Sequence, residues 1–209
     1  MFFRRFSCSL ALVGGLILNV AAGAAEPPMA PLPPMPSVGD EIVWKKSGVE
    51  GDYIVKVIAT KKDTFTLKSP SGATTKYSRN FIVSPISWTN AKGELRGEVK
   101  VVSGRPNSLF PLDTEKSTSF LDSGYTKDGG HEWQGILQLC YVKSTESLSV
   151  PAGTFDVYKV NCRKVKGDWW MNMTWDYAPS VGYYVKKIEE HSNGKLGTWE
   201  LIRYKKAGN

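Results

Sequence analysis

Residues 137–162, LQLCYVKSTESLSVPAGTFDVYKVNC, contain two runs of alternating side chains on either side of a Pro-Ala-Gly stretch. Alternation of apolar and polar residues is typical of a half-buried β-strand, and proline with glycine between two such runs is typical of a turn. We therefore predict a β-hairpin centred on Pro151. In that hairpin Cys140 lies opposite Cys162, at a separation that a disulfide can span.

The first 24 residues have the pattern of a secretory signal peptide. Arg4 and Arg5 precede an apolar run from Leu10 to Val20, and Ala22-Gly23-Ala24 supplies the small residues of a cleavage site. Cleavage after Ala24 removes both arginines and no acid, so the formal net charge falls from +7 to +5. Cys8 precedes the apolar run instead of closing it, which argues against a lipid-modified cysteine. No later segment approaches ~18 consecutive apolar residues, so we expect a periplasmic or secreted protein.

Cys140 and Cys162 are the cysteines that remain after this cleavage. Export to an oxidising compartment favours a structural disulfide between them. Two buried free thiols and a redox-active pair are the alternatives. A redox-active pair is disfavoured because the chain has no Cys-x-x-Cys spacing that would lower a thiol pKa.

The rest of the chain shows the same alternation, with Gly, Pro, Asp and Ser between the runs. We predict an all-β fold, a curved antiparallel sheet or half-barrel of about ten strands. A short helix between Asp113 and Phe120 is the single helical segment that we consider. The expected strands are residues 41–45, 53–60, 64–68, 75–77, 136–143, 155–164, 169–177, 183–190 and 196–205.

The domain organisation follows from proline content and from a weak internal similarity. Residues 25–37 are rich in proline and are expected to form an extended spacer, and residues 38–209 form one all-β domain. A shift of 81 residues places Pro70 and Gly72 on Pro151 and Gly153. This match indicates either two repeated β halves, 38–105 and 106–209, or hairpins that converged on the same turn residues.

Sequence motifs for catalysis or metal binding are incomplete. The segment beginning at His131-Glu132 has Gly135 where a zincin helix needs its second histidine. Glu189 and Glu190 are neighbours in a strand and point to opposite faces, so they cannot act together on one substrate. The lysine pairs 45–46, 61–62, 186–187 and 205–206 are expected to keep strand ends soluble. We therefore predict no enzyme, no metal site, no cofactor and no nucleic-acid partner.

The best candidate for a binding site is the aromatic strand at 169–177, WWMNMTWDY. Alternation places five large side chains on one face of this strand. Such a face either fills a barrel core or lines a cavity for an apolar or ring-shaped ligand. The five candidate ligand-binding residues are Trp169, Met171, Met173, Trp175 and Tyr177.

Two blocks of sequence resemble a known family. VPAGTFDVYKVNC at 150–162 and WDYAPSVGYYVKKIE at 175–189 look like the paired Pro-Ala-Gly-x-Phe and Tyr-Ala-Pro-x-Val-Gly signature of exported bacterial β-domains of unknown function. The resemblance covers residues 109–204. It implies a periplasmic protein on a curved sheet or half-barrel, distantly similar in shape to lipoprotein carriers, and it carries over no catalytic residue.

The function expected from these features is a binding role at the cell envelope. The ligand would be an apolar or lipid-like envelope molecule held by the 169–177 face. The alternative is a structural or interaction module that binds an envelope protein. An envelope hydrolase is less well supported, because no carboxylate pair is evident in the sequence.

Overall fold

The computed structural model describes residues 29–83 and 85–208. The predicted signal peptide and its cleavage site lie outside the described residues. Across the described part of the chain, no helix is long and apolar enough to cross a membrane.

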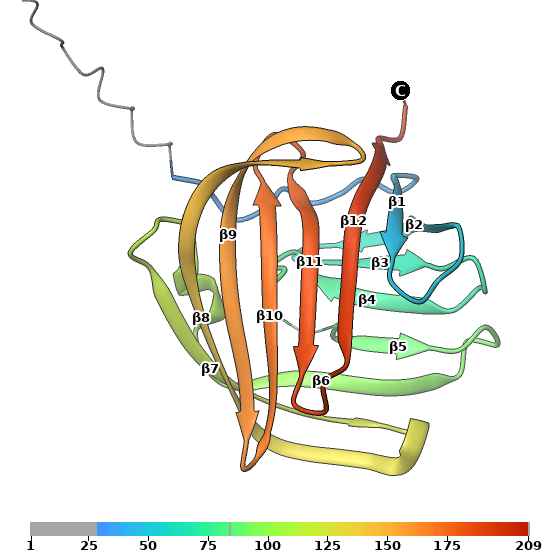
Figure 1. Ribbon diagram of the computed structural model, residues 1–209. Coiled ribbons are helices and arrows are strands. Elements are labelled where there is room, and N and C mark those ends of the chain that lie inside the picture. Colours follow the sequence, from blue (N-terminus) through green and yellow to red (C-terminus); the bar gives the residue numbers. More distant parts are fainter. Residues whose placement is uncertain (1–28, 84, 209) are drawn as a thin grey trace, which may run out of the picture.

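Twelve antiparallel strands form one closed barrel, and each strand pairs with its neighbours in the sequence (Figure 1). The prediction of an all-β, antiparallel fold is confirmed. The predicted curved sheet or half-barrel of about ten strands is corrected to a closed barrel of twelve, because the first strand pairs with the last. The described residues contain no α-helix and two short 3₁₀ turns. The elements are β1 (Glu41–Lys46), β2 (Asp52–Lys61), β3 (Thr64–Lys68), β4 (Thr74–Ser78), β5 (Ser87–Thr89), β6 (Leu95–Gly104), η1 (Pro106–Leu109), β7 (Ser117–Thr126), η2 (Asp128–Gly130), β8 (His131–Val150), β9 (Gly153–Lys166), β10 (Trp169–Ala178), β11 (Tyr183–His191) and β12 (Leu196–Lys205).

The seam between β1 and β12 closes the barrel over only part of its height. β1 has six residues and β12 has ten, and their pairing runs from Glu41 opposite Lys205 to Lys46 opposite Trp199. Hydrogen bonds between Ser47 and Thr198 extend the seam by one more step. The first residues of β12 therefore have no paired strand on the side where β1 lies.

A barrel of this size is too wide to be filled by its own strands, since eight strands already leave an interior that side chains just fill. The connection between β4 and β5 enters the barrel and supplies part of the core. Phe81 stacks on Tyr177 at a centroid distance of 5.2 Å and packs against Trp175 at 5.7 Å. Ile82 is buried beside them.

The long β8–β9 hairpin arches over one end of the barrel towards β12 (Figure 1). Its turn is Pro151-Ala152, and the N–H of Ala152 donates to the carbonyl of Leu201 on β12 at 2.9 Å. Gly153 follows with φ 135°, a conformation that favours glycine. The Pro-Ala-Gly motif therefore builds a hairpin tip that covers the barrel end.

Cys140 and Cys162 face each other on β8 and β9 and form a disulfide. If the register at the turn continued unchanged along the hairpin, the two cysteines would be offset by one residue. Between Val142 and Ser144 the pairing shifts by one residue, because Lys143 is an extra residue in β8. This bulge brings the two cysteines into one directly opposite pair.

The described part of the Pro-rich segment lies against the barrel. Ala30 is buried and exchanges backbone hydrogen bonds with Leu112. Pro34 lies at the β10–β11 turn, where a Cβ on Gly182 would come within 2.7 Å of the proline Cγ. The glycine of the Tyr-Ala-Pro-x-Val-Gly motif thus leaves room for the Pro-rich segment.

The two stretches that suggested a duplication are both hairpin turns. Residues 69–73 connect β3 and β4, and Pro151-Ala152 connects β8 and β9. Both halves contribute to one barrel. Duplication of the halves 38–105 and 106–209 stays a prediction.

Candidate functional site

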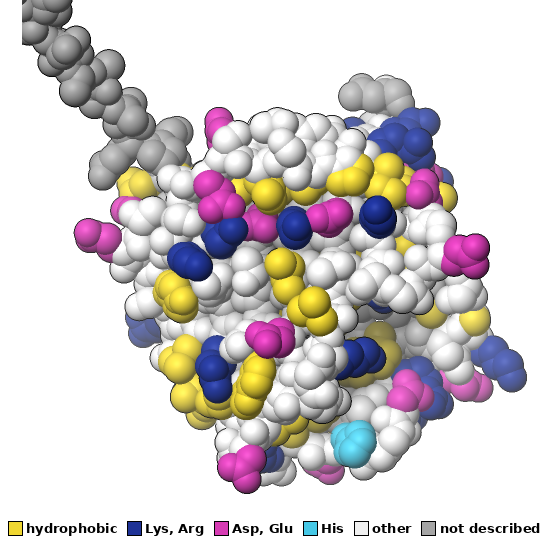
Figure 2. All heavy atoms as spheres, viewed as in Figure 1, with side chains coloured by type: hydrophobic (Ala, Val, Ile, Leu, Met, Phe, Trp, Pro, Cys, Tyr) yellow, Lys and Arg dark blue, Asp and Glu magenta, His cyan; other side chains and the backbone are white. Residues whose placement is uncertain are grey.

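A cavity of about 230 Å³ lies inside the barrel. Met171, Met173 and Trp175 of β10 form part of its wall, and Phe65 and Tyr77 approach from β3 and β4. Figure 2 shows the surface hollowed beside the start of β12, with basic and hydrophobic side chains in the hollow. The cavity therefore opens where the β1–β12 seam ends.

The five candidate residues on β10 have three different environments. Met171, Met173 and Trp175 line the cavity. Tyr177 is buried in the core against Phe81 and does not line the cavity. Trp169, at the start of the strand, is 39% exposed and does not line it either.

Four side chains form a row across the inner face of β10, β11, β12 and β1, which we call the inner ladder. Trp175 lies opposite Lys187, Lys187 opposite Trp199, and Trp199 opposite Lys46. The Lys187 ammonium is 4.3 Å from the ring centroid of Trp175 and 4.7 Å from that of Trp199. The Lys46 ammonium is 5.4 Å from the Trp199 ring. Cation–π attraction thus stabilises two lysines on an aromatic cavity wall.

The same four strands carry charges on the outer face, in a row that we call the outer ladder. Asp176 lies opposite Lys186, Lys186 opposite Glu200, and Glu200 opposite Lys45. Lys186 Nζ is 2.7 Å from a Glu200 carboxylate oxygen. Basic and acidic side chains alternate across this face in Figure 2. Burial raises the pKa of Asp176, and Lys159 opposes that shift from 3.7 Å.

Two of the predicted solvent-facing lysines therefore lie inside the barrel. Lys46 and Lys187 line the cavity, whereas their neighbours Lys45 and Lys186 point outward. The expectation that both lysine pairs only keep strand ends soluble is corrected by this alternation. The sequence offers no direct signal for the inward lysine, because its position opposite Trp175 depends on the register between β10 and β11.

Lys187 is a largely buried charge of the cavity wall, with a side chain 15% exposed. Burial lowers its pKa, and the ion pair with Glu189 acts in the opposite direction. Lys164 and Lys46 lower the pKa further, so other positive charges lie near this ammonium. Glu189 lines the cavity from the same strand.

Tyrosine hydroxyls complete the polar part of the wall. Burial raises the pKa of Tyr77 to about 12, with smaller contributions from Tyr53 and Glu189. Burial also raises the pKa of Tyr183 and Tyr184. These phenols stay neutral at physiological pH and offer hydrogen bonds without charge.

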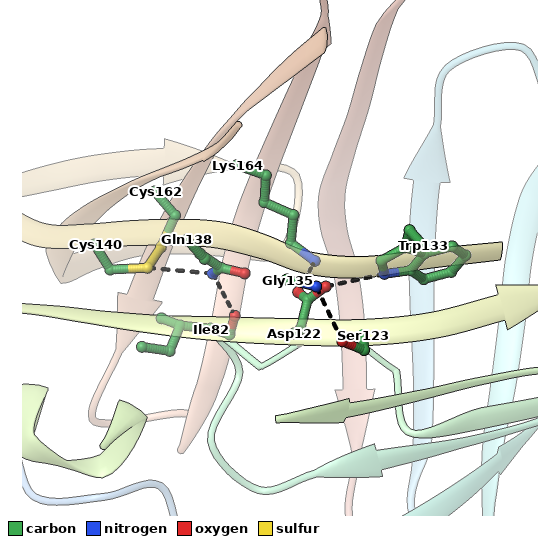
Figure 3. Close-up of polar contacts among 9 residues, drawn as sticks. All are labelled: Ile82, Asp122, Ser123, Trp133, Gly135, Gln138, Cys140, Cys162 and Lys164. Carbon is green, nitrogen blue, oxygen red and sulfur yellow. Dashed lines mark hydrogen bonds and ion pairs between the residues drawn. A yellow bond between two sulfur atoms is a disulfide. The ribbon is translucent and has the colours of Figure 1, made fainter. Parts of the chain in front are cut away.

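A second polar cluster holds β7, β8 and β9 together beside the disulfide (Figure 3). Lys164 Nζ is 2.8 Å from a buried Asp122 oxygen, and the indole N–H of Trp133 donates to the other oxygen at 3.1 Å. Gln138 donates to the Ile82 carbonyl at 2.7 Å. This cluster fixes the β4–β5 connection against the sheet.

The arrangement does not assemble a metal site from the described residues. Within 29–83 and 85–208, no group of three His, Cys, Asp or Glu side chains is placed to hold a metal ion. What the cavity offers chemically is aromatic and thioether surface, two lysines, one arginine, one carboxylate and neutral hydroxyls.

No protein-family model matches this chain. No sequence among the curated proteins matches it.

Three solved structures of bacterial proteins are similar in part to this chain. The hypothetical lipoprotein YmcC from Escherichia coli has 9% identity and a TM-score of 0.49, covering 78% of this chain and 83% of its own. A proposed exported protein with a YmcC-like fold from Bacteroides fragilis has 13% identity and a TM-score of 0.45, covering 85% and 100%. A proposed lipoprotein from Parabacteroides distasonis has 15% identity and a TM-score of 0.39, covering 85% and 98%.

Proposed function

We propose that this chain is an exported, non-enzymatic binding protein that holds a small apolar ligand in the barrel cavity. The observation that carries the proposal is the cavity wall of Met171, Met173 and Trp175, which meets the aromatic wall of β3 and β4 across an opening to solvent. Ligand sites are typically concave and mostly apolar, with a few polar groups that orient the ligand. The flexible, polarizable methionines suit a ligand of irregular shape.

The size of the cavity limits the ligand. A volume of about 230 Å³ corresponds to roughly eight water-sized groups, since one water occupies about 30 Å³ in the liquid. A single ring or a short acyl chain fits this space, whereas a lipid with two long chains does not. A longer single chain would extend through the opening at the seam.

Tryptophan fluorescence tests the proposal, because Trp175 and Trp199 both lie at the cavity. We expect saturable quenching or a spectral shift with at least one member of a panel of single-chain alcohols, acids and amines. Replacement Trp175→Phe should remove much of that change. The matched control is Trp170→Phe, because Trp170 lies on the opposite face of the same strand, over Arg163 at 5.1 Å.

The proposal fails if no member of the panel changes the fluorescence or releases heat in calorimetry. It also fails if Trp170→Phe removes the signal and Trp175→Phe keeps it. Either result would favour the alternative of an interaction module for an envelope protein.

A further inference from the structure

We infer that the ligand of this cavity is a small amphiphilic carboxylate, whose acid group is bound at the inner ladder by Lys187 and Lys46. The inference rests on the proposed function and adds the chemical class of the ligand. It is carried by unpartnered donors, by the balance of charge and by the size of the cavity.

Two buried donors at the cavity lack a hydrogen-bond acceptor. Among the described residues, the buried side-chain N–H groups without a partner are Trp175 Nε1 and Arg79 Nε, and both residues line the cavity. Trp175 is 7% exposed. Arg79 Nε is 3.6 Å from an Asp63 oxygen, which is too far for a hydrogen bond. Buried donors without a protein acceptor are rare in folded proteins, so these two N–H groups at one cavity are available to an acceptor on a ligand.

The charges that line the cavity are unbalanced. Lys46, Arg79 and Lys187 are positive, and Glu189 is the one carboxylate among the lining residues. Arg79 has an ion-pair partner outside the lining, because an Asp63 oxygen is 3.6 Å from its Nε, so the excess charge is that of Lys46. Glu189 is paired with Lys187. For Lys46, the described residues provide no carboxylate within the range of an ion pair, and its ammonium lies 5.1 Å from the Tyr53 ring and 5.4 Å from the Trp199 ring. A ligand anion would compensate this excess, and a cation would add to it.

A carboxylate fits both observations at once. It brings negative charge and two acceptor oxygens, which can take hydrogen bonds from an ammonium and from a neutral N–H group together. The Met171 and Met173 side of the cavity then receives the apolar part of the ligand. Roughly eight non-hydrogen atoms fill the space, which corresponds to a short fatty acid or an aromatic acid.

Three probes with one chain and different head groups test the inference: octanoate, 1-octanol and octylammonium. Calorimetric titration of the full protein should give octanoate an affinity at least about tenfold higher than 1-octanol, the difference expected of one charge-assisted interaction. Octylammonium should bind most weakly. Equal affinity for octanoate and 1-octanol, or a preference for octylammonium, would overturn the inference and leave the proposed function standing. Binding of none of the three overturns the proposed function instead.

A pair of double variants distinguishes the inner ladder from general surface charge. Lys187→Met with Glu189→Gln removes an inner ion pair without leaving one partner alone, and the preference for octanoate should fall to within about threefold of 1-octanol. Lys186→Met with Glu200→Gln removes the neighbouring ion pair of the outer face. The control variant should still bind octanoate more tightly than 1-octanol. Loss of this preference in the control variant but not in the inner variant would overturn the inference.

A single substitution gives a change in the opposite direction. Glu189→Gln removes the carboxylate that competes for Lys187. Octanoate should then bind at least about threefold more tightly than to the unmodified protein, with 1-octanol unchanged. Weaker octanoate binding in a variant with an unchanged circular dichroism spectrum would contradict the assignment of Lys187 as the anion-binding group.

Discussion

Removal of the Cys140–Cys162 disulfide should lower the free energy of unfolding by about 3 kcal/mol. The two cysteines are 22 residues apart in the sequence, and both are nearly fully buried. In the chain-entropy account, the bond restricts the unfolded chain by closing this loop. Breaking it restores those conformations to the unfolded state and leaves the folded barrel with the same strand pairing.

Equilibrium unfolding in urea measures this effect. The protein is unfolded with and without reductant, refolded, and compared by circular dichroism. With a slope of about 2 kcal/mol per molar urea, the midpoint of the reduced protein should fall by roughly 1.5 M. The double variant Cys140→Ala with Cys162→Ala serves as the control, because reductant should not change its midpoint.

Two results would refute the reasoning. Equal midpoints for the oxidised and reduced protein would show that the bond does not restrict the unfolded state. A response to reductant in the cysteine-free variant would show that the reductant acts elsewhere.

Three further predictions concern the turn, the buried ion pair and the tyrosines. Gly182→Ala should lower the free energy of unfolding by about 1–3 kcal/mol. At this position φ is +75°, and an added Cβ would lie 2.7 Å from a ring atom of Pro34. The control Gly194→Ala, with φ +80° and no atom close to the added Cβ, should cost less in the same urea assay. Lys164→Met should cost about 3–5 kcal/mol, since it leaves the Asp122 carboxylate buried without its 2.8 Å partner. A fall in the free energy of unfolding of less than about 1 kcal/mol would contradict the account. Burial raises the pKa of Tyr77 and Tyr177 to about 12, so each contributes stability that is complete below pH ~10 and is lost as the pH rises towards ~12, on the order of 2–3 kcal/mol each. Phenolate absorbance should show both residues titrating late, and ionisation at the ordinary pKa in the folded protein would exclude the burial argument.

The sequence analysis located nine of the twelve strands, and alternation of buried side chains is clear in only some of them. β3, β8, β9 and β10 carry buried side chains at every second position over part of their length, whereas the buried side chains of β11 are Tyr183 and Val185 and that of β12 is Leu201. β5, β6 and β7 were not assigned, and a helix was considered at Asp113–Phe120, where β7 begins at Ser117. β6 and β7 contain glycine, serine and several exposed residues, so their sequences show little alternation. Their strand conformation depends mainly on pairing with neighbouring strands.

Three of the five residues expected at a binding face on β10 line the cavity, and their role in binding stays a prediction. Met171, Met173 and Trp175 were identified because alternation on one strand is a local property. Lys46 and Lys187 were interpreted as surface residues, since the sequence does not show that Lys46, Trp199, Lys187 and Trp175 lie directly opposite one another on four strands. Tyr177 was expected at the site because alternation places it on the same face of β10 as Met173 and Trp175. In the barrel, Phe81 of the β4–β5 connection packs against Tyr177 and fills that part of the interior.

The sequence by itself determined the strand character, the Pro-Ala-Gly turn and the inward face of β10, because backbone preferences and alternation act over a few residues. The tertiary structure decided the closure of β1 on β12, the bulge at Lys143 that aligns the cysteines, and the side of the wall on which each lysine lies. These features depend on register between strands, and a shift of one residue moves every side chain of a strand to the opposite face. Register is set by contacts between distant segments, so the cavity exists only once the barrel has closed.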